Sequence, residues 1–133
     1  MKISLDNALG IHPDALQLRA QRTQMLARNI AHADTPGFKA QDVDFQSALA
    51  RSVDAQAQTT RVRTTHVGHQ EPTRQTAEGQ VKYRLPNMPS LDGNTVDVQA
   101  EQARFAENNM QFLASLRFVN GRLTGMLSAI RGE

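Results

Sequence analysis

The side chains that could perform chemistry in this sequence are few and lie far apart. His66 and His69 stand three residues apart, and Glu71 follows them. A zinc site needs three or four ligands in a fixed geometry, and the Thr- and Gln-rich segment around these residues supplies no complete set. We therefore interpret the two histidines as solvated loop residues and predict no metal site.

A pair of carboxylates is the next candidate for acid–base chemistry. Asp42 and Asp44 stand two residues apart in a stretch that reads as extended, where alternate side chains point the same way. Acid catalysis by such a pair needs an apolar pocket that raises the pKa of one carboxyl, and the surrounding sequence predicts none. We therefore expect no catalytic carboxylates.

Other enzyme classes are excluded by composition and motif. The chain has no Cys, so it has no disulfide, no catalytic thiolate and no Cys-based metal site. Its serines lack the context of a nucleophile elbow, and no Gly-rich phosphate loop is present. The sequence predicts a protein that is not an enzyme, has no cofactor and takes no small-molecule substrate.

The charge balance argues against a nucleic-acid partner. The 15 basic and 13 acidic residues leave a net charge of +2, and the basic residues are scattered, whereas nucleic-acid-binding proteins cluster them on one face. A small basic excess in the middle of the chain leaves open a weak anionic partner, such as peptidoglycan or phospholipid headgroups. An ordinary solvated loop explains that excess more simply.

Size and composition favour one modest domain or one elongated helical unit. The chain has 133 residues, of which 39% are hydrophobic and 5% aromatic, so we expect no large self-sufficient core. No apolar run approaches the ~18 residues of a membrane span. The N-terminal residues lack the apolar region of a cleavable secretory signal.

The strongest structural pattern is a long helix over residues 95–131, which contain no Pro. Residues at alternating four- and three-residue spacing form the a/d seam of a helix that packs against a partner helix. The seam consists of Phe105, Asn109, Phe112, Leu116, Val119, Leu123, Met126 and Ile130. We predict an N-cap at Thr95, after a turn, and a C-terminal stop at Gly132.

A second helix is predicted to begin at Pro13 and to end before the turn residues 34–37. It carries the same four-three spacing, through Ile11, Ala15, Leu18, Arg22, Met25 and Asn29. We expect residues 1–33 and 95–133 to pair as one coiled-coil-like helical hairpin in a mainly α fold. The packing residues would be Leu18 and Met25 together with the apolar residues of the C-terminal seam.

Residues 34–94 are expected to hold a turn motif and an irregular, partly extended insertion. Residues 45–52 suit a short helix, and residues 60–64 and 81–85 alternate like strands. A small β-hairpin between those two fragments is one arrangement that the pattern allows. Residues 86–94 read as a loop.

Two features of the seams bear on assembly. Asn29 and Asn109 occupy seam positions, where a polar residue either sets the register of the helices or simply caps or faces solvent. Each helix also carries more apolar stripe than the other can cover. We predict that the surplus packs against other molecules.

Two stretches together resemble one known family. Residues 27–40, Ala-Arg-Asn-Ile-Ala-His-Ala-Asp-Thr-Pro-Gly-Phe-Lys-Ala, resemble the N-terminal signature of flagellar rod, hook and hook-associated proteins. Residues 92–98, Asp-Gly-Asn-Thr-Val-Asp-Val, are similar to the stretch before the C-terminal helix in proximal rod subunits of that family. The motif residues are Asn29, Ala33, Asp34, Thr35, Pro36, Gly37, Phe38 and Lys39 in the first stretch, and Asp92, Gly93, Asn94 and Thr95 in the second. His32 departs from the family's usual Asn, and Phe38 replaces the commoner Tyr.

The resemblance implies a structural subunit of the proximal rod in the bacterial flagellar basal body. Such a subunit is exported by the flagellar type III system, polymerises helically in the periplasmic space, and links the export gate and membrane ring to the rest of the rod. Its implied partners are copies of itself, other rod subunits, the rod-base adaptor protein, and export-gate and membrane-ring components. The alternatives are another flagellar rod subunit, or a cytoplasmic coiled-coil adaptor or export chaperone.

Overall fold

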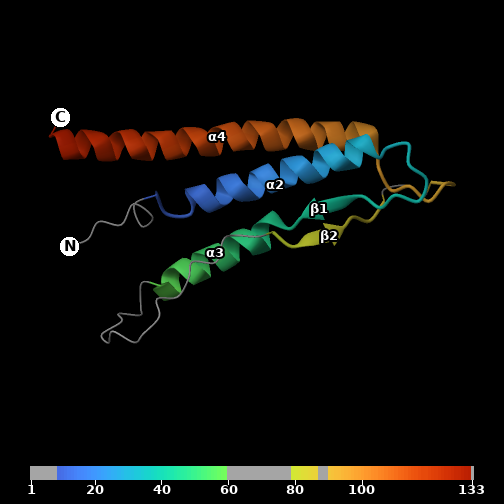
Figure 1. Ribbon diagram of the computed structural model, residues 1–133, viewed down its shortest axis with the longest axis horizontal. Coiled ribbons are helices and arrows are strands. Elements are labelled where there is room, and N and C mark those ends of the chain that lie inside the picture. The colour runs from blue at the N-terminus through green and yellow to red at the C-terminus, as the bar shows by residue number, and fades with distance from the viewer. Residues whose placement is uncertain (1–8, 60–78, 87–89, 133) are drawn as a thin grey trace.

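The computed structural model describes residues 9–59, 79–86 and 90–132. In these residues three helices and two short strands follow one another (Figure 1). The order is α2 (His12–Ala31), β1 (Gln41–Val43), α3 (Phe45–Thr59), β2 (Val81–Tyr83) and α4 (Val98–Arg131). The described part of the chain is therefore mainly helical, as predicted.

The long helices α2 and α4 lie side by side and run in opposite directions (Figure 1). Their register can be followed from cross-helix contacts: Asn29 with Glu101, Thr23 with Asn108, and the His12 ring on the Phe118 ring. Since α4 has 34 residues and α2 has 20, the C-terminal part of α4 continues past the start of α2.

The ends of these helices agree with the sequence at two points and differ at one. Pro13 lies in the first turn of α2, and Gly132 ends α4 with a φ of 78° while its amide donates to the Ser128 carbonyl. The predicted N-cap at Thr95 is wrong. Asp97 caps α4, with its carboxylate accepting from the Ala100 amide at 3.2 Å, because the Thr95 hydroxyl is engaged by the Ala40 amide at 2.8 Å.

The sheet consists of β1 and β2, which pair antiparallel with Gln41 opposite Tyr83 and Val43 opposite Val81. The strand predicted within residues 81–85 is thus present as β2, and it pairs with β1. The fragment 60–64 lies outside the described residues. The short helix predicted over 45–52 extends to Thr59, because Ala and Gln, which favour helix, dominate its second half.

The core is small and lies where α2, β1 and α3 meet. Leu18, Val43 and Ala48 are buried there, and partly buried Met25, Phe45 and Leu49 pack around them. Gly79, just before β2, closes this cluster from one side: a Cβ added to it would lie 2.0 Å from Val43 Cγ1 and 3.3 Å from Leu18 Cδ2. The close approach of the backbone at this point requires glycine.

We therefore predict that Gly79→Ala lowers the free energy of unfolding by about 1–3 kcal/mol, since one added methyl group overpacks the core. Urea unfolding followed by far-UV circular dichroism measures the effect. Gly121→Ala in α4 is the matched control, because a Cβ there meets nothing within 4 Å. That substitution should leave stability unchanged or raise it by about 1 kcal/mol. Equal effects of the two changes would contradict the packing described at Gly79.

Candidate functional site

The two sequence motifs meet in space at the end of α2. The side-chain amide of Asn94 donates to three backbone carbonyls of the turn: His32 at 3.1 Å, Ala33 at 2.6 Å and Thr35 at 3.0 Å. Asn94 is buried. These carbonyls belong to the turn that follows α2, which ends at Ala31, and one side chain from the second motif binds all three of them.

Backbone contacts complete this contact region, which we call the motif junction (residues 32–39 and 92–95). The Gly37 amide donates to the Asp92 carbonyl at 2.9 Å, and the Thr95 amide donates to the Phe38 carbonyl at 3.0 Å. Gly37 and Gly93 have φ angles of 73° and 74°, a region that glycine occupies without strain. The motif junction thus holds the segment that follows α2 against the segment that precedes α4.

Side chains also cross the motif junction. Lys39 Nζ donates to the Gly93 carbonyl at 2.7 Å. The His32 ring stacks on Phe38 with centroids 4.6 Å apart and planes 15° apart, and His32 Nδ1 lies 3.2 Å from the Thr35 hydroxyl. The two residues that depart from the family signature therefore contact each other. Pro36 and Asp34 are exposed in the same turn, and Ala33 is half-buried.

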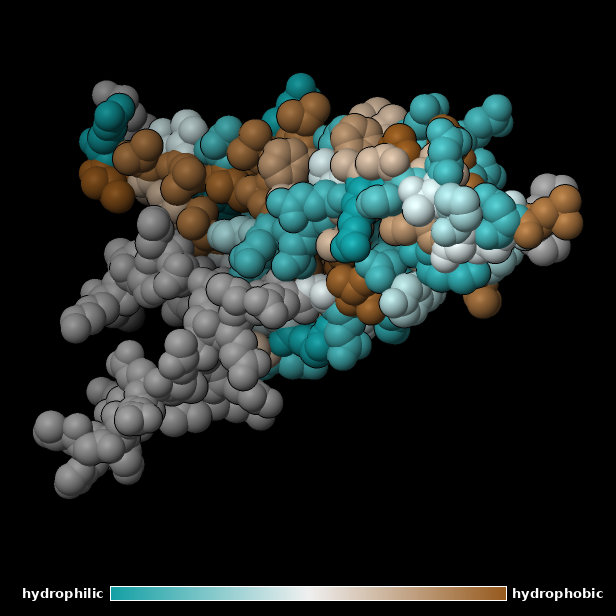
Figure 2. Space-filling model, turned by 45° about the vertical axis from the view of Figure 1, so that its right-hand side comes forward, coloured by the Kyte–Doolittle hydropathy of each residue, from teal (hydrophilic) through white to brown (hydrophobic). Residues whose placement is uncertain are grey.

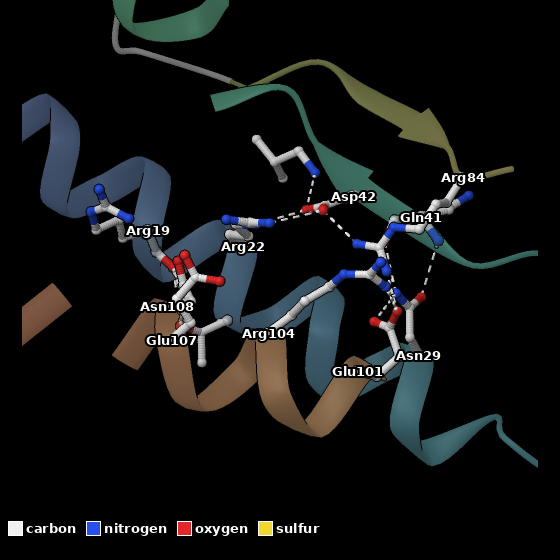
Figure 3. A network of polar contacts seen from close by, with 12 residues as sticks. Arg19, Arg22, Asn29, Gln41, Asp42, Arg84, Glu101, Arg104, Glu107 and Asn108 are labelled. Carbon is white, nitrogen blue, oxygen red and sulfur yellow. Dashed lines mark hydrogen bonds and ion pairs between the residues drawn. The ribbon is translucent and has the colours of Figure 1, made fainter. Parts of the chain in front are cut away.

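Asn29 of the first motif lies inside the molecule. Its side-chain amide donates to the Gln41 carbonyl at 2.7 Å and to Glu101 at 3.0 Å, and its carbonyl oxygen accepts from the Gln41 amide at 3.1 Å (Figure 3). The side chain is 1% exposed. Of the two interpretations left open for Asn29, exposure to solvent is wrong, and contact with the facing helix is observed.

A network of charged side chains continues from Asn29 across α2, β1, α4 and the residue that follows β2. Asp42 in β1 binds Arg22 of α2 through two hydrogen bonds of 3.0 and 3.1 Å, and it also pairs with Arg84, which follows β2. Arg84 reaches on to Glu101 in α4, and Arg104 approaches the same carboxylate at 2.9 Å (Figure 3). We call these five residues and Asn29 the polar network.

The carboxyl groups next to the sheet titrate below their ordinary range. Burial alone would raise the pKa of Asp42, but its hydrogen bonds to Arg22 and Arg84 and the charge of Arg22 outweigh burial, and the pKa is lowered. The hydrogen bond from Lys82, 2.6 Å away, is the main cause that lowers the pKa of Asp44 to about 2. Both groups are therefore anions that hold basic partners, as a structural role requires.

A second buried amide lies farther along the α2–α4 contact. Asn108 donates to the Arg19 carbonyl at 3.0 Å and to the Thr23 hydroxyl at 2.8 Å. Its own side-chain oxygen is buried and finds no partner among the described residues. The seam pattern had singled out Asn109, which is half-buried, and so missed the interface amide by one residue.

The predicted packing residues fall into three groups in the single chain. Leu18 is fully buried and Met25 packs on the core. Phe105, Phe112, Val119, Leu123 and Met126 are half-buried, whereas Leu116 and Ile130 are 38% and 82% exposed. At ~100° per residue the seam lies roughly 40° around α4 from the line of Glu101 and Asn108 that faces α2. Figure 2 shows the resulting hydrophobic surface along α4.

Sequence reasoning missed most of the polar network. Arg22 stood out only as a polar member of an apolar seam, and Asp42 only as a rejected catalytic carboxylate. Nothing in the residue pattern marked Arg84 or Glu101.

No group of three or more potential metal ligands is found in the part of the chain that is described, and His66 and His69 lie outside it. Within that same part, no helix is long and apolar enough to cross a membrane.

Comparison with known proteins gives a consistent result. No family model matches the chain. The flagellar basal body rod protein FlgB of Escherichia coli (strain K12) is 44% identical over 133 residues, covering 96% of this chain and 95% of the relative. FlgB of Aeromonas hydrophila is 43% identical and covers 100% and 99%. FlgB of Cereibacter sphaeroides is 45% identical, with 94% of each covered.

The motif junction predicts a strong effect of one isosteric change. Asn94→Asp replaces the amide that donates to three carbonyls with a carboxylate that is repelled by them. We expect a loss of about 1–3 kcal/mol in the free energy of unfolding, measured by urea titration of helical circular dichroism. Asn120→Asp on the exposed part of α4 is the control and should have little effect. Equal free energies of unfolding for the two variants would show that the contacts of Asn94 do not stabilise the fold.

The lowered pKa values of Asp42 and Asp44 predict acid sensitivity. A carboxyl whose pKa is lower in the folded chain stabilises it above the unfolded value of about 4 and loses that contribution as the pH falls further. Unfolding midpoints in urea should therefore decline from about pH 4 towards pH 2. Asp42→Asn should lower the midpoint at pH 7 and flatten the decline. Asp54→Asn, exposed on α3, should reproduce the parent curve; a decline that is unchanged in Asp42→Asn would exclude Asp42 as its source.

Proposed function

The chain belongs to the FlgB family of flagellar basal body rod proteins, and from this premise we propose that it is a structural subunit of the proximal rod. A rod subunit of this family is a structural protein of the flagellar basal body and not an enzyme. In our proposal the subunit leaves the cell through the flagellar type III system and polymerises helically. It then joins the export gate and membrane ring to the rest of the rod.

The observation that carries the proposal is the apolar surface of α4 that α2 leaves uncovered. Met110, Leu113, Leu127 and Ile130 are each more than half exposed. Contiguous exposed apolar surface of this kind is typical of a protein–protein contact. In our proposal the stripe of one subunit packs on a different face of the next subunit, so the contact is heterologous, and heterologous contacts that do not close produce a helical polymer.

Packing between helices is the second part of the proposal. We infer that α2 and α4 act as a coiled-coil-like hairpin whose seam, from Phe105 to Ile130, is completed by neighbouring subunits. Copies of this chain and other rod subunits would supply those neighbours along the rod. The rod-base adaptor protein and the export-gate and membrane-ring components would do so at its base.

The small core supports export of the subunit as an unfolded chain. Among the described residues only Leu18, Leu26, Ala40, Val43 and Ala48 are buried hydrophobics. A chain with so little apolar burial has a small free energy of unfolding. Assembly can then restore stability by burying the α4 stripe.

The proposal is tested by deleting the gene and restoring a tagged copy. We expect basal bodies without rods in the deletion strain, and tagged protein at the rod base after complementation, both seen by electron microscopy. Normal rods in the deletion strain, with tagged protein that stays in the cytoplasm, would favour an adaptor or chaperone. Tag found only at the distal end of the rod would favour another rod subunit.

A point variant tests the assembly surface. Leu116→Asp places a carboxylate in the apolar stripe, so docking of the next subunit would bury an unpaired charge. We expect the affinity of one subunit for the next to fall about tenfold or more, which corresponds to about 1.4 kcal/mol. Rods per cell should then fall while expression is unchanged. Ala129→Asp, which is exposed and lies about 140° around α4 from Leu116, should assemble normally. Normal rods from Leu116→Asp would refute the seam as a contact.

A further inference from the structure

Strand β2 and the residues that follow it are charged on one side and apolar on the other, because successive side chains of an extended chain point in opposite directions. On the charged side, Lys82 binds Asp44, and Arg84 binds both Asp42 and Glu101. The apolar residues on the opposite side are 48%, 72% and 88% exposed: Val81, Tyr83 and Leu85. Apart from its pairing with β1, the strand is therefore attached to the other described elements mainly through its charged side.

Both buried side chains of α4 are polar, namely Glu101 and Asn108. Two guanidinium groups bind Glu101, one from Arg84 and one from Arg104 at 2.9 Å. Arg104 lies three residues further along the same helix, so it stays with the carboxylate whether or not α4 is docked. Arg84 comes from the end of β2, so it reaches Glu101 only while α4 is docked. Of the two cations, only Arg84 makes compensation of the buried charge depend on the position of α4.

Arg84 is itself held in place by the rest of the polar network. Its amide donates to the Ala40 carbonyl at 2.9 Å, and its guanidinium pairs with Asp42, which Arg22 of α2 also binds. A path of ion pairs thus runs from α2 through β1 and Arg84 to α4 (Figure 3). Without Arg84, Glu101 would lose a charged partner while still buried, and such a loss is strongly destabilising. Movement of α4 away from α2 would return the carboxylate to water.

We propose that Arg84 is a latch that fastens the first turns of α4 to α2, and that this part of α4 detaches from an intact core when Arg84 is withdrawn. The core can remain because its buried residues, Leu18, Val43 and Ala48, come from α2, β1 and α3. The latch can be reached from outside, since both sequence neighbours of Arg84 are exposed, and a contact that moves the strand would release the helix. The inference concerns one chain and does not rest on the assignment to the rod.

The chain has no native Cys, so an introduced thiol can report on the detachment of α4. Leu26 of α2 is fully buried but is not part of the core cluster. It lies about 60° around the helix from Thr23, which binds Asn108 of α4. The thiol of Leu26→Cys therefore reacts with excess dithionitrobenzoate only when α4 has moved away. The thiol of Ala48→Cys, inside the core, reports on global unfolding through the same reaction.

Each reporter chain is compared with the same chain carrying Arg84→Gln, Glu101→Gln, both changes together, or Arg104→Gln as the matched control. We expect Arg84→Gln to speed labelling of Leu26→Cys about tenfold or more and to leave labelling of Ala48→Cys unchanged. Adding Glu101→Gln should restore the rate at Leu26→Cys to within about threefold of the parent, since no charge is then left to bury. Arg104→Gln should speed labelling about twofold or less, as for an ion pair within one helix.

The latch is refuted if Arg84→Gln leaves the rate at Leu26→Cys unchanged, or if it speeds labelling of both thiols equally, which would mean global unfolding. It is also refuted if the variant with both Gln substitutions labels as fast as Arg84→Gln alone, because Arg84 would then act through packing and not through the charge of Glu101. An effect of Arg104→Gln as large as that of Arg84→Gln would show that the position of β2 does not control α4.

Discussion

A carboxylate held away from water near the start of α4 is the constraint on which the other elements depend. Glu101 is 1% exposed, and a buried charge without partners is strongly destabilising. Its partners come from separate places: Asn29 from α2, Arg84 from the end of β2, and Arg104 from the next turn of α4. The charge of Glu101 is therefore fully compensated only when these elements are docked together.

The small sheet exists because of this arrangement. Two strands of three residues are not stable by themselves, and β1 would present an open edge on the side away from β2. Asn29 closes that edge by bonding both the amide and the carbonyl of Gln41. Arg84 then links β2 through Asp42 and Glu101 to both helices. Side chains, more than main-chain pairing, hold the strands in place.

The sequence predicted those parts of the structure that repeat or that have local signals. Heptad spacing identified α2 and α4, and turn chemistry identified the end of α2 and Gly132. The position of β1 could not be read, because Gln-Asp-Val does not alternate in polarity and its pairing depends on Asn29 and Arg84. The cap moved from Thr95 to Asp97 because a tertiary contact with Ala40 competes for the hydroxyl. Glu101 and Asn108 were missed for a related reason: polar residues are normally exposed, and only their distant partners explain their burial.

Apolar packing and directional hydrogen bonds meet different requirements of this chain. Apolar residues that repeat every heptad supply attraction, but the repeat by itself defines no alignment. The contacts of Asn29, Asn94 and Asn108 are few and directional, so they define an alignment. A subunit that is proposed to cross a membrane unfolded and then dock needs this separation. Burial missing from its small core can be recovered in the polymer, but a heptad error would displace the docking stripe by about 10 Å before any neighbour arrives.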